Sequence, residues 1–238
     1  EQEWASPGYY GVDLLDYGVK AEMTSGIRSG ILQFTYPESD SSFILLDMNH
    51  TLWQSCPWSN LRVENDSTLV GYKLVKGWGP ERHVYFTAVF SKPFRDFGIM
   101  QDTIPVKYNT NRFRSSLEAW GKDLRFWMRF PTRQGEMVTV KTAVSAVSSD
   151  GAKLNMQELE GKTFASLKAE GEKLWEGQLS KFKIEATPEQ RETFYTSVYH
   201  AFLHPFIFQD ADGKFRELDK NIGQAEGFTN YTVFSLWD

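Results

Sequence analysis

The stretch MVTVKTAV at residues 137–144 decides how most of this chain is interpreted. Its Val138, Val140 and Val144 share one side of an extended backbone, because successive side chains of a strand point to opposite faces. The stretch VKAEMT at 19–24 alternates in the same way, with Val, Ala and Met on one face. This two-residue period predicts half-buried β-strands.

Denser apolar runs and turn residues continue this pattern from Tyr9 to Val147. The runs FILL at 43–46 and VYFTAVF at 84–90 predict strands that are covered on both sides. Turn-forming residues separate the runs, at 7–8, 64–66, 77–80 and 133–135. Many strands with tight turns and no helical pattern between them predict an antiparallel β-sandwich. The opening residues 4–10 resemble a chain that enters a sheet partway, so we expect strands to be missing before them.

Near residue 150 the period of the apolar residues changes to 3.6. One predicted helix carries a stripe along a single face, made of Phe164, Leu167, Gly171, Leu174, Trp175 and Leu179. A second helix is predicted from Thr187, a natural N-cap that is followed by Pro188 and completes a capping box with Gln190. Its stripe is Phe194, Val198 and Phe202, and Pro205 ends it at about His204.

Composition narrows the class of protein. The chain has 238 residues, 41% of them hydrophobic, which is enough to fill a sizeable core. The net charge of −5, without a basic tract, argues against nucleic acid or an anionic membrane surface as partner. No apolar run approaches the roughly 20 residues that span a bilayer. Cys56 is the single cysteine, so an internal disulfide is excluded.

Aromatic residues are abundant, with 8 Trp, 10 Tyr and 18 Phe. Trp and Tyr rings are natural platforms for the apolar face of a sugar. Three tryptophans lie within apolar patterns and are predicted to be core: Trp120, Trp127 and Trp175. Three others lie in turn-like surroundings and are freer to face a ligand: Trp53, Trp58 and Trp78.

Two motifs are compatible with a metal-binding site, but for both we favour an interpretation without a metal. His200 and His204 have the i, i+4 spacing of a zinc site, but the residue after the first histidine is alanine where a catalytic site has glutamate. We favour the interpretation that these histidines pack within the protein or place a charge at the C-terminus of a helix. The stretch 210–213 resembles an EF-hand loop, but alignment on its glycine puts Phe208 first and Asp219 last. We therefore expect a plain turn there, followed by irregular chain to Asp238, and no metal site in the chain.

Several stretches occur together, and in the same order, in a known family. They are ASPGYY at 5–10, DYGVKAEMT at 16–24, VYF at 84–86, FSKPF at 90–94, the segment 138–145 ending in Ser145, Gly151-Ala152 with Asn155, TFYTSVYH at 193–200, DADGKFR at 210–216 and YTVFSLWD at 231–238. In this order they resemble the family 92 glycoside hydrolases, which are exo-acting α-mannosidases. The match extends over essentially the whole chain.

The resemblance implies a mainly β fold: an antiparallel β-sandwich (supersandwich), a linker helix and the first helices of an (α/α)6 barrel. The corresponding domains are a sandwich at 1–150 with its N-terminal strands missing, a helical linker at 151–185 and the truncated start of the barrel at 186–238. The implied activity is a calcium-dependent, inverting removal of terminal α-linked mannose, most often α-1,2. In such a reaction one carboxylic acid protonates the leaving oxygen while a carboxylate activates water.

The resemblance also implies that the catalytic acid, the base and the calcium ligands lie downstream of Asp238. No catalytic residue is then expected in this chain, and the chain alone is expected to be inactive. Asp238, with Trp237 beside it, is the one position carried over as a substrate contact. At 30–34 the chain departs from relatives that carry His-Arg before the aromatic, so no role is assigned to Leu32 or Gln33.

The sequence is therefore interpreted as the N-terminal part of a periplasmic or secreted α-mannosidase. Its expected partners are α-mannoside glycans and the remainder of its own polypeptide, with no nucleic acid and no membrane span. The alternative is a non-catalytic carbohydrate-binding or structural β-sandwich module.

Overall fold

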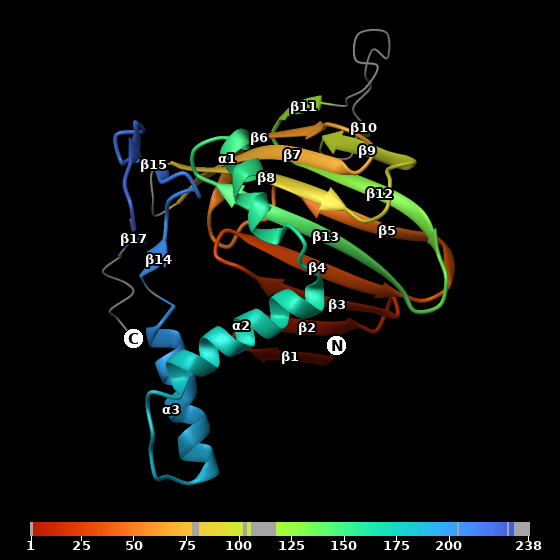
Figure 1. Ribbon diagram of the computed structural model, residues 1–238. Helices are drawn as coiled ribbons and strands as arrows, with labels where there is room; N and C mark the ends of the chain where they lie inside the picture. The colour runs from red at the N-terminus through yellow and green to blue at the C-terminus, as the bar shows by residue number, and fades with distance from the viewer. Residues whose placement is uncertain are drawn as a thin grey trace.

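A computed structural model describes residues 2–77, 81–101, 104–105, 118–203, 205–227 and 229–230. Most of the described residues before position 146 form two antiparallel sheets (Figure 1). The larger sheet has the strand order β1 (Gln2–Ser6), β2 (Tyr9–Leu14), β3 (Val19–Ser25), β4 (Ser29–Tyr36), β13 (Glu136–Ser145), β8 (Arg82–Phe90), β7 (Thr68–Lys76), β6 (Ser55–Val63) and β11 (Glu118–Gly121). The smaller sheet has the order β10 (Ile104–Pro105), β9 (Asp96–Gln101), β12 (Leu124–Thr132) and β5 (Ser39–Asp47).

The main hydrophobic core lies between the two sheets. The smaller sheet contributes Ile99 and the β12 side chains Leu124, Phe126, Met128 and Phe130. The larger sheet contributes residues from seven of its strands, among them Val19, Tyr36, Leu61, Leu69, Phe90, Ala119 and Val138. Burial of each large apolar side chain contributes about 1.5–3 kcal/mol, so this layer supplies most of the stability of the sandwich.

Strand β13 confirms the alternation that the sequence predicts and shows where the core ends. Val138 and Val140 are buried in the core, but Val144 on the same face is exposed. On the opposite face Ala143 and Ser145 are buried, because a helix packs there. Near its end the strand therefore has its buried face on the helical side of the sheet.

Strand β5 differs from its prediction as a strand covered on both sides. It is the edge strand of the smaller sheet, paired with β12 only among the described strands. Phe43 and Leu45 are about half exposed on its outer face. The prediction was wrong because a dense apolar run does not reveal whether a strand will lie at the edge of a sheet.

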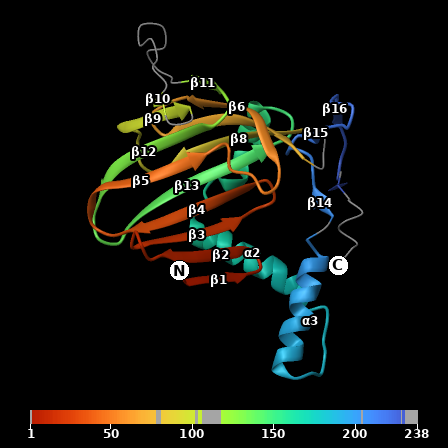
Figure 2. The same ribbon diagram turned by 180° about the vertical axis from the view of Figure 1, so that it is seen from behind.

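Two helices lie on the outer face of the larger sheet, in front of it in Figure 1 and behind its strands in Figure 2. Helix α1 (Ser149–Met156) packs on β13 and β8, and a 3-10 turn, η1 (Gln157–Leu159), follows it. Helix α2 (Phe164–Leu179) packs on β2, β3 and β4. Phe164 and Leu167 of α2 form a second, smaller core with Ile31 and Leu159. The C-terminal half of the α2 stripe is less covered, with Leu174 63% exposed.

Helix α3 (Pro188–Ala201) begins as the sequence predicts. The Thr187 side chain accepts a hydrogen bond from the Gln190 backbone, and the Gln190 side chain accepts one from the Thr187 backbone. The helix extends away from the sheets (Figure 1), and none of its residues is buried. Phe194 and Phe202 of its apolar stripe pack against the ring of Phe182, but Phe202 remains 42% exposed.

Two short hairpin-like pairs follow α3 where irregular chain was expected. Strand β14 (Phe206–Ile207) pairs with β17 (Thr229–Asn230), and β15 (Lys214–Arg216) pairs with β16 (Ile222–Gln224). Strands of two or three residues give too little periodicity to be predicted. Among the described residues, no helix has the length and apolar character needed to cross a membrane.

Candidate functional site

Four residues singled out in the sequence lie outside the described residues. They are the two predicted substrate contacts, Trp237 and Asp238, together with His204 and Trp78. The site is therefore built from the residues that precede Trp237 and Asp238.

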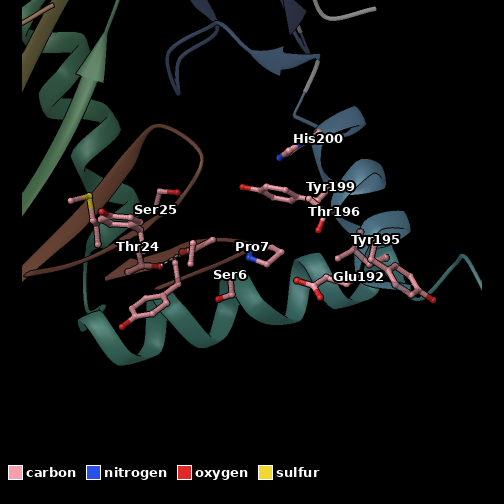
Figure 3. Close-up of a pocket in the computed structure, with 15 residues that line it drawn as sticks. Ser6, Pro7, Thr24, Ser25, Glu192, Tyr195, Thr196, Tyr199 and His200 are labelled. Atoms are coloured by element: carbon pink, nitrogen blue, oxygen red, sulfur yellow. Dashed lines mark hydrogen bonds between the residues drawn. The ribbon is translucent and has the colours of Figure 1, made fainter. Parts of the chain in front are cut away.

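A cleft of about 800 Å³ lies between the β1–β2 turn and α3 (Figure 3). Tyr199 and Glu192 extend from α3 toward the turn that carries Ser6 and Pro7. The rest of its lining includes Tyr9, Met23, Thr24, Ser25, Leu179, Tyr195, Thr196 and His200. Residues of both the sandwich and the helices that follow it therefore line the cleft.

Local contacts fix both walls of the cleft. Gly8 adopts a φ of +80°, a left-handed conformation that glycine accepts readily, and its carbonyl accepts a 2.8 Å hydrogen bond from the Thr24 hydroxyl. On the other wall, the rings of Trp175 and Tyr199 meet edge to face, with centroids 4.7 Å apart. The Tyr195 hydroxyl donates to the Phe182 carbonyl at 2.7 Å.

A polar network lies beneath the β1–β2 wall. The Tyr9 hydroxyl donates to Glu22 at 2.7 Å and accepts from the Trp4 indole at 2.8 Å, while the Lys168 ammonium lies 3.8 Å from the centre of the Tyr9 ring. Burial and the hydrogen bond to Glu22 raise the pKa of Tyr9, so its hydroxyl stays protonated. Burial acts to raise the pKa of Glu22, but hydrogen bonds from Tyr9 and Lys20 outweigh it and lower that pKa. Glu22 is therefore an ionised acceptor at neutral pH.

The lining of the cleft is suited to binding a ligand. Hydroxyl groups and the faces of aromatic rings are the groups that contact polyhydroxylated ligands, and Glu192 is the carboxylate that the described lining contributes. An acid–base pair for glycoside hydrolysis needs two carboxyl groups flanking one bond. The described lining by itself thus supports binding of a ligand and not proton transfer to it.

The described residues do not fit a calcium or zinc site. Among them, no three His, Cys, Asp or Glu side chains lie close enough to hold a metal ion. His200 is on the exposed end of α3. In the EF-hand-like stretch, the Gly213 backbone donates to the Asp210 carbonyl at 2.9 Å, which confirms the predicted turn. The Lys214 ammonium lies 2.7 Å from the Asp212 carboxylate, and their hydrogen bond lowers the pKa of that group.

The solvent exposure of the tryptophans differs in part from the prediction. Trp53 and Trp58 are exposed, as expected, and Trp127 and Trp175 are partly buried. Trp120 is 54% exposed, so its assignment to the core was wrong. It lies on the edge strand β11, and its indole donates to the Glu118 carboxylate at 3.0 Å.

One feature was not predicted from the sequence. We call it the buried polar cluster, and it consists of Ser145, Asn155 and Asp210. The Ser145 hydroxyl donates to Asp210 Oδ2 at 2.6 Å, and the Asn155 amide donates to Asp210 Oδ1 at 2.8 Å. All three side chains are buried. Each residue belongs to a different stretch quoted above for the family resemblance. Their contact could not be predicted, because 55 residues separate Asn155 from Asp210.

Family models identify the chain. The model of the glycosyl hydrolase family 92 N-terminal domain matches residues 1–145, and that of the family 92 catalytic domain matches residues 151–238. The chain belongs to this family, which confirms the resemblance. Its mainly β fold followed by helices is that of the family's N-terminal β-sandwich and the start of its helical barrel.

Solved structures give the same result. The family GH92 α-mannosidase BT3965 from Bacteroides thetaiotaomicron is 69% identical with a TM-score of 0.93, and the match covers 99% of this chain and 32% of that one. The same enzyme in complex with mannoimidazole matches at 69% identity and a TM-score of 0.92, covering 99% and 31% of the two chains. The family GH92 inverting mannosidase BT2199 from Bacteroides thetaiotaomicron VPI-5482 shares the fold at 22% identity, with a TM-score of 0.79 and coverage of 94% and 30%. A comparison with curated proteins found no match. The chain therefore spans about a third of the length of these structures.

Proposed function

We propose that this chain is the sandwich and the first helices of an α-mannosidase that releases terminal α-linked mannose from glycans. The observation that carries the proposal is 69% identity, over 99% of the chain, to an α-mannosidase. That enzyme also has a structure in complex with mannoimidazole, a ligand named for its relation to mannose. The alternative, a non-catalytic binding or structural module, is disfavoured by the match of residues 151–238 to the catalytic-domain model.

We further propose inverting hydrolysis with a preference for α-1,2 linkages. Inversion needs a general acid and a general base about 6.5–9.5 Å apart, on opposite sides of the bond that breaks. We assign both, together with the ligands of a required calcium ion, to polypeptide beyond Asp238. Within this chain, Asp238 and Trp237 are proposed to bind the mannose, because a carboxylate can accept hydrogen bonds from two neighbouring sugar hydroxyls.

The proposed place of action is the periplasm or the outside of the cell. Glycans made by other cells reach an enzyme there without crossing the inner membrane. Expression of the complete gene, followed by cell fractionation and immunoblotting, checks this assignment. Recovery of the protein from the cytosolic fraction alone would contradict it.

The decisive experiment compares the complete polypeptide with chain 1–238 on α-1,2-, α-1,3- and α-1,6-mannobiose. We expect the complete protein to release mannose fastest from the α-1,2 substrate, to give the β-anomer first by NMR, and to lose activity in EDTA. Chain 1–238 is expected to be inactive, since absence of a positioned acid and base removes at least ~10²–10⁴ in rate. Calcium-dependent mannose release by chain 1–238 would contradict the assignment of the catalytic groups. An inactive complete protein that still binds mannosides would favour the non-catalytic module.

A further inference from the structure

The buried polar cluster connects the part of the chain that matches the N-terminal-domain family model to the part that matches the catalytic-domain family model. Ser145 is the last residue of β13 and the last residue matched by the N-terminal-domain model. Asp210 lies within residues 151–238, which the catalytic-domain model matches. Asp210 is 4% exposed, and each of its carboxylate oxygens accepts a hydrogen bond from one of the other two cluster residues. Burial of a carboxylate costs free energy unless hydrogen-bond donors stabilise it. Asp210 is therefore favoured only where both donors reach it.

The other polar atoms of the cluster are paired as well. The Asn155 amide also donates to the Val144 carbonyl at 2.8 Å, and its oxygen accepts from the Ala211 backbone at 2.8 Å. The Ser145 hydroxyl oxygen accepts from the Val147 backbone at 2.9 Å. A fully satisfied buried network of this kind defines one arrangement of the segments that it connects.

Glycine 151 allows the cluster to close. A Cβ atom at Gly151 would collide with Asp210 Oδ2 and would lie 2.6 Å from the Ser145 hydroxyl oxygen. The backbone of α1 thus approaches the carboxylate as closely as a residue without a side chain permits. Any larger residue at this position must displace Asp210.

Two arginines hold the polypeptide on either side of Asp210. Arg28, from the sandwich, donates through Nε to the Gln209 carbonyl at 2.6 Å and pairs with Glu158 at 2.7 Å. Arg216 reaches back to the end of the sandwich and donates to the Ala146 and Val147 carbonyls at 2.8 and 2.9 Å. Residues 209–216 are therefore held against the sandwich at three places.

The segment held in this way is the one that leads to the proposed sugar contact. Strand β14 ends three residues before Asp210 and pairs with β17, so the cluster lies next in the chain to one partner of that strand pair. Asp238 follows β17 by eight residues in the sequence. We propose that Asp210 is a positioning residue of the mannosidase, which holds residues 209–216 of the catalytic-domain part against the sandwich and thereby sets the position from which the chain continues toward the residues that bind mannose. The inference rests on the proposed function.

The experiment uses the complete protein and the variants Asp210→Asn and Ser145→Ala. Asp212→Asn is the matched control, because Asp212 has the same side chain two residues away but pairs with Lys214 at the surface. All proteins are assayed on α-1,2-mannobiose at a temperature where circular dichroism shows them fully folded. We expect kcat/KM to fall about 10- to 100-fold in Asp210→Asn, as misplacement of binding groups by about 1 Å can produce. Ser145→Ala should lose less, and Asp212→Asn should stay within about twofold of the wild type.

The outcomes separate the two proposals. If the wild-type protein releases no mannose, the proposed function fails, and this inference fails with it. If the wild type is active and folded Asp210→Asn keeps its kcat/KM while its melting temperature falls, the cluster is structural only and this inference alone fails. If Asp210→Asn does not fold, Ser145→Ala decides, because it leaves the carboxylate and its Asn155 donor in place. Unchanged kcat/KM in that folded variant would then overturn the inference.

Discussion

At the scale of single residues, Phe126 shows how position decides stability. It has no exposed surface and contacts the rings of Phe90, Phe94 and Phe97 between the two sheets. Replacement by alanine leaves a cavity, so Phe126→Ala is expected to lower the free energy of unfolding by about 3–5 kcal/mol. Phe43→Ala removes the same ring from a half-exposed site and should cost far less. Urea denaturation of both variants measures the difference, and equal losses would contradict the assignment of the core.

Asp238 is the residue on which the proposed function depends most directly. If it contacts the sugar, Asp238→Asn in the complete protein should cost ~2–4 kcal/mol of transition-state binding, seen as a lower kcat/KM. If it caps the following helix instead, the substitution costs about 1 kcal/mol of stability and leaves turnover nearly intact. Melting temperature and steady-state kinetics, measured on the same preparations, distinguish the two roles. A lowered melting temperature with wild-type kcat/KM would assign Asp238 to capping alone.

At the scale of elements, α2 and α3 have equivalent caps but different partners. Both begin with a capping box, at Thr163 and at Thr187, but only α2 buries side chains against the sandwich. Helix α3 instead contacts α2 and the connection before it, through the ring pairs Trp175–Tyr199 and Phe182–Phe194. Because a short helix is marginally stable in water, we expect α3 with these few contacts to open more readily than α2. We expect the N-terminal half of α2, which buries Phe164 and Leu167, to unfold only with the sheet beneath it.

This difference predicts unequal effects of the same substitution in chain 1–238. Thr163→Ala should lower the free energy of global unfolding by about 1 kcal/mol, whereas Thr187→Ala should leave it nearly unchanged and accelerate exchange of the α3 amides. Denaturation curves and hydrogen exchange followed by mass spectrometry provide the two readouts. Equal protection of α3 and of the first turns of α2 would show that the contacts of α3 hold it as firmly as the sheet holds α2, and would contradict this prediction.

At the scale of the whole molecule, large apolar side chains on α2 and at the end of α3 are exposed. Leu174, Phe202 and Leu203 are each exposed by two fifths or more, on α2 and at the end of α3. Contiguous exposed apolar surface favours association. Chain 1–238 is therefore expected to form concentration-dependent oligomers in sedimentation velocity, and the double variant Phe202→Ser/Leu203→Ser should reduce them. A monomeric wild-type chain over the full concentration range would contradict this prediction.

Local patterns determined much of the fold. The alternation at 137–144 predicted β13, and Val138 and Val140 are buried as that pattern requires. Thr187, Pro188 and Gln190 predicted the start of α3, because a capping box involves only neighbouring residues. The family resemblance added what such patterns do not contain, namely the helical barrel and the assignment of Asp238, which remains a prediction.

Contacts between distant segments were decided by the tertiary structure alone. Trp120 and Phe43 are exposed because their strands lie at sheet edges, and strand order cannot be read from periodicity. Ser145 and Asp210 meet only because residues 209–216 fold back onto the end of β13, where Arg216 also donates to the Ala146 and Val147 carbonyls. The sequence determines which side of each strand or helix is apolar, since that depends on spacing along the chain. Which surfaces become covered, and which polar groups pair, depends on how the elements come together in space.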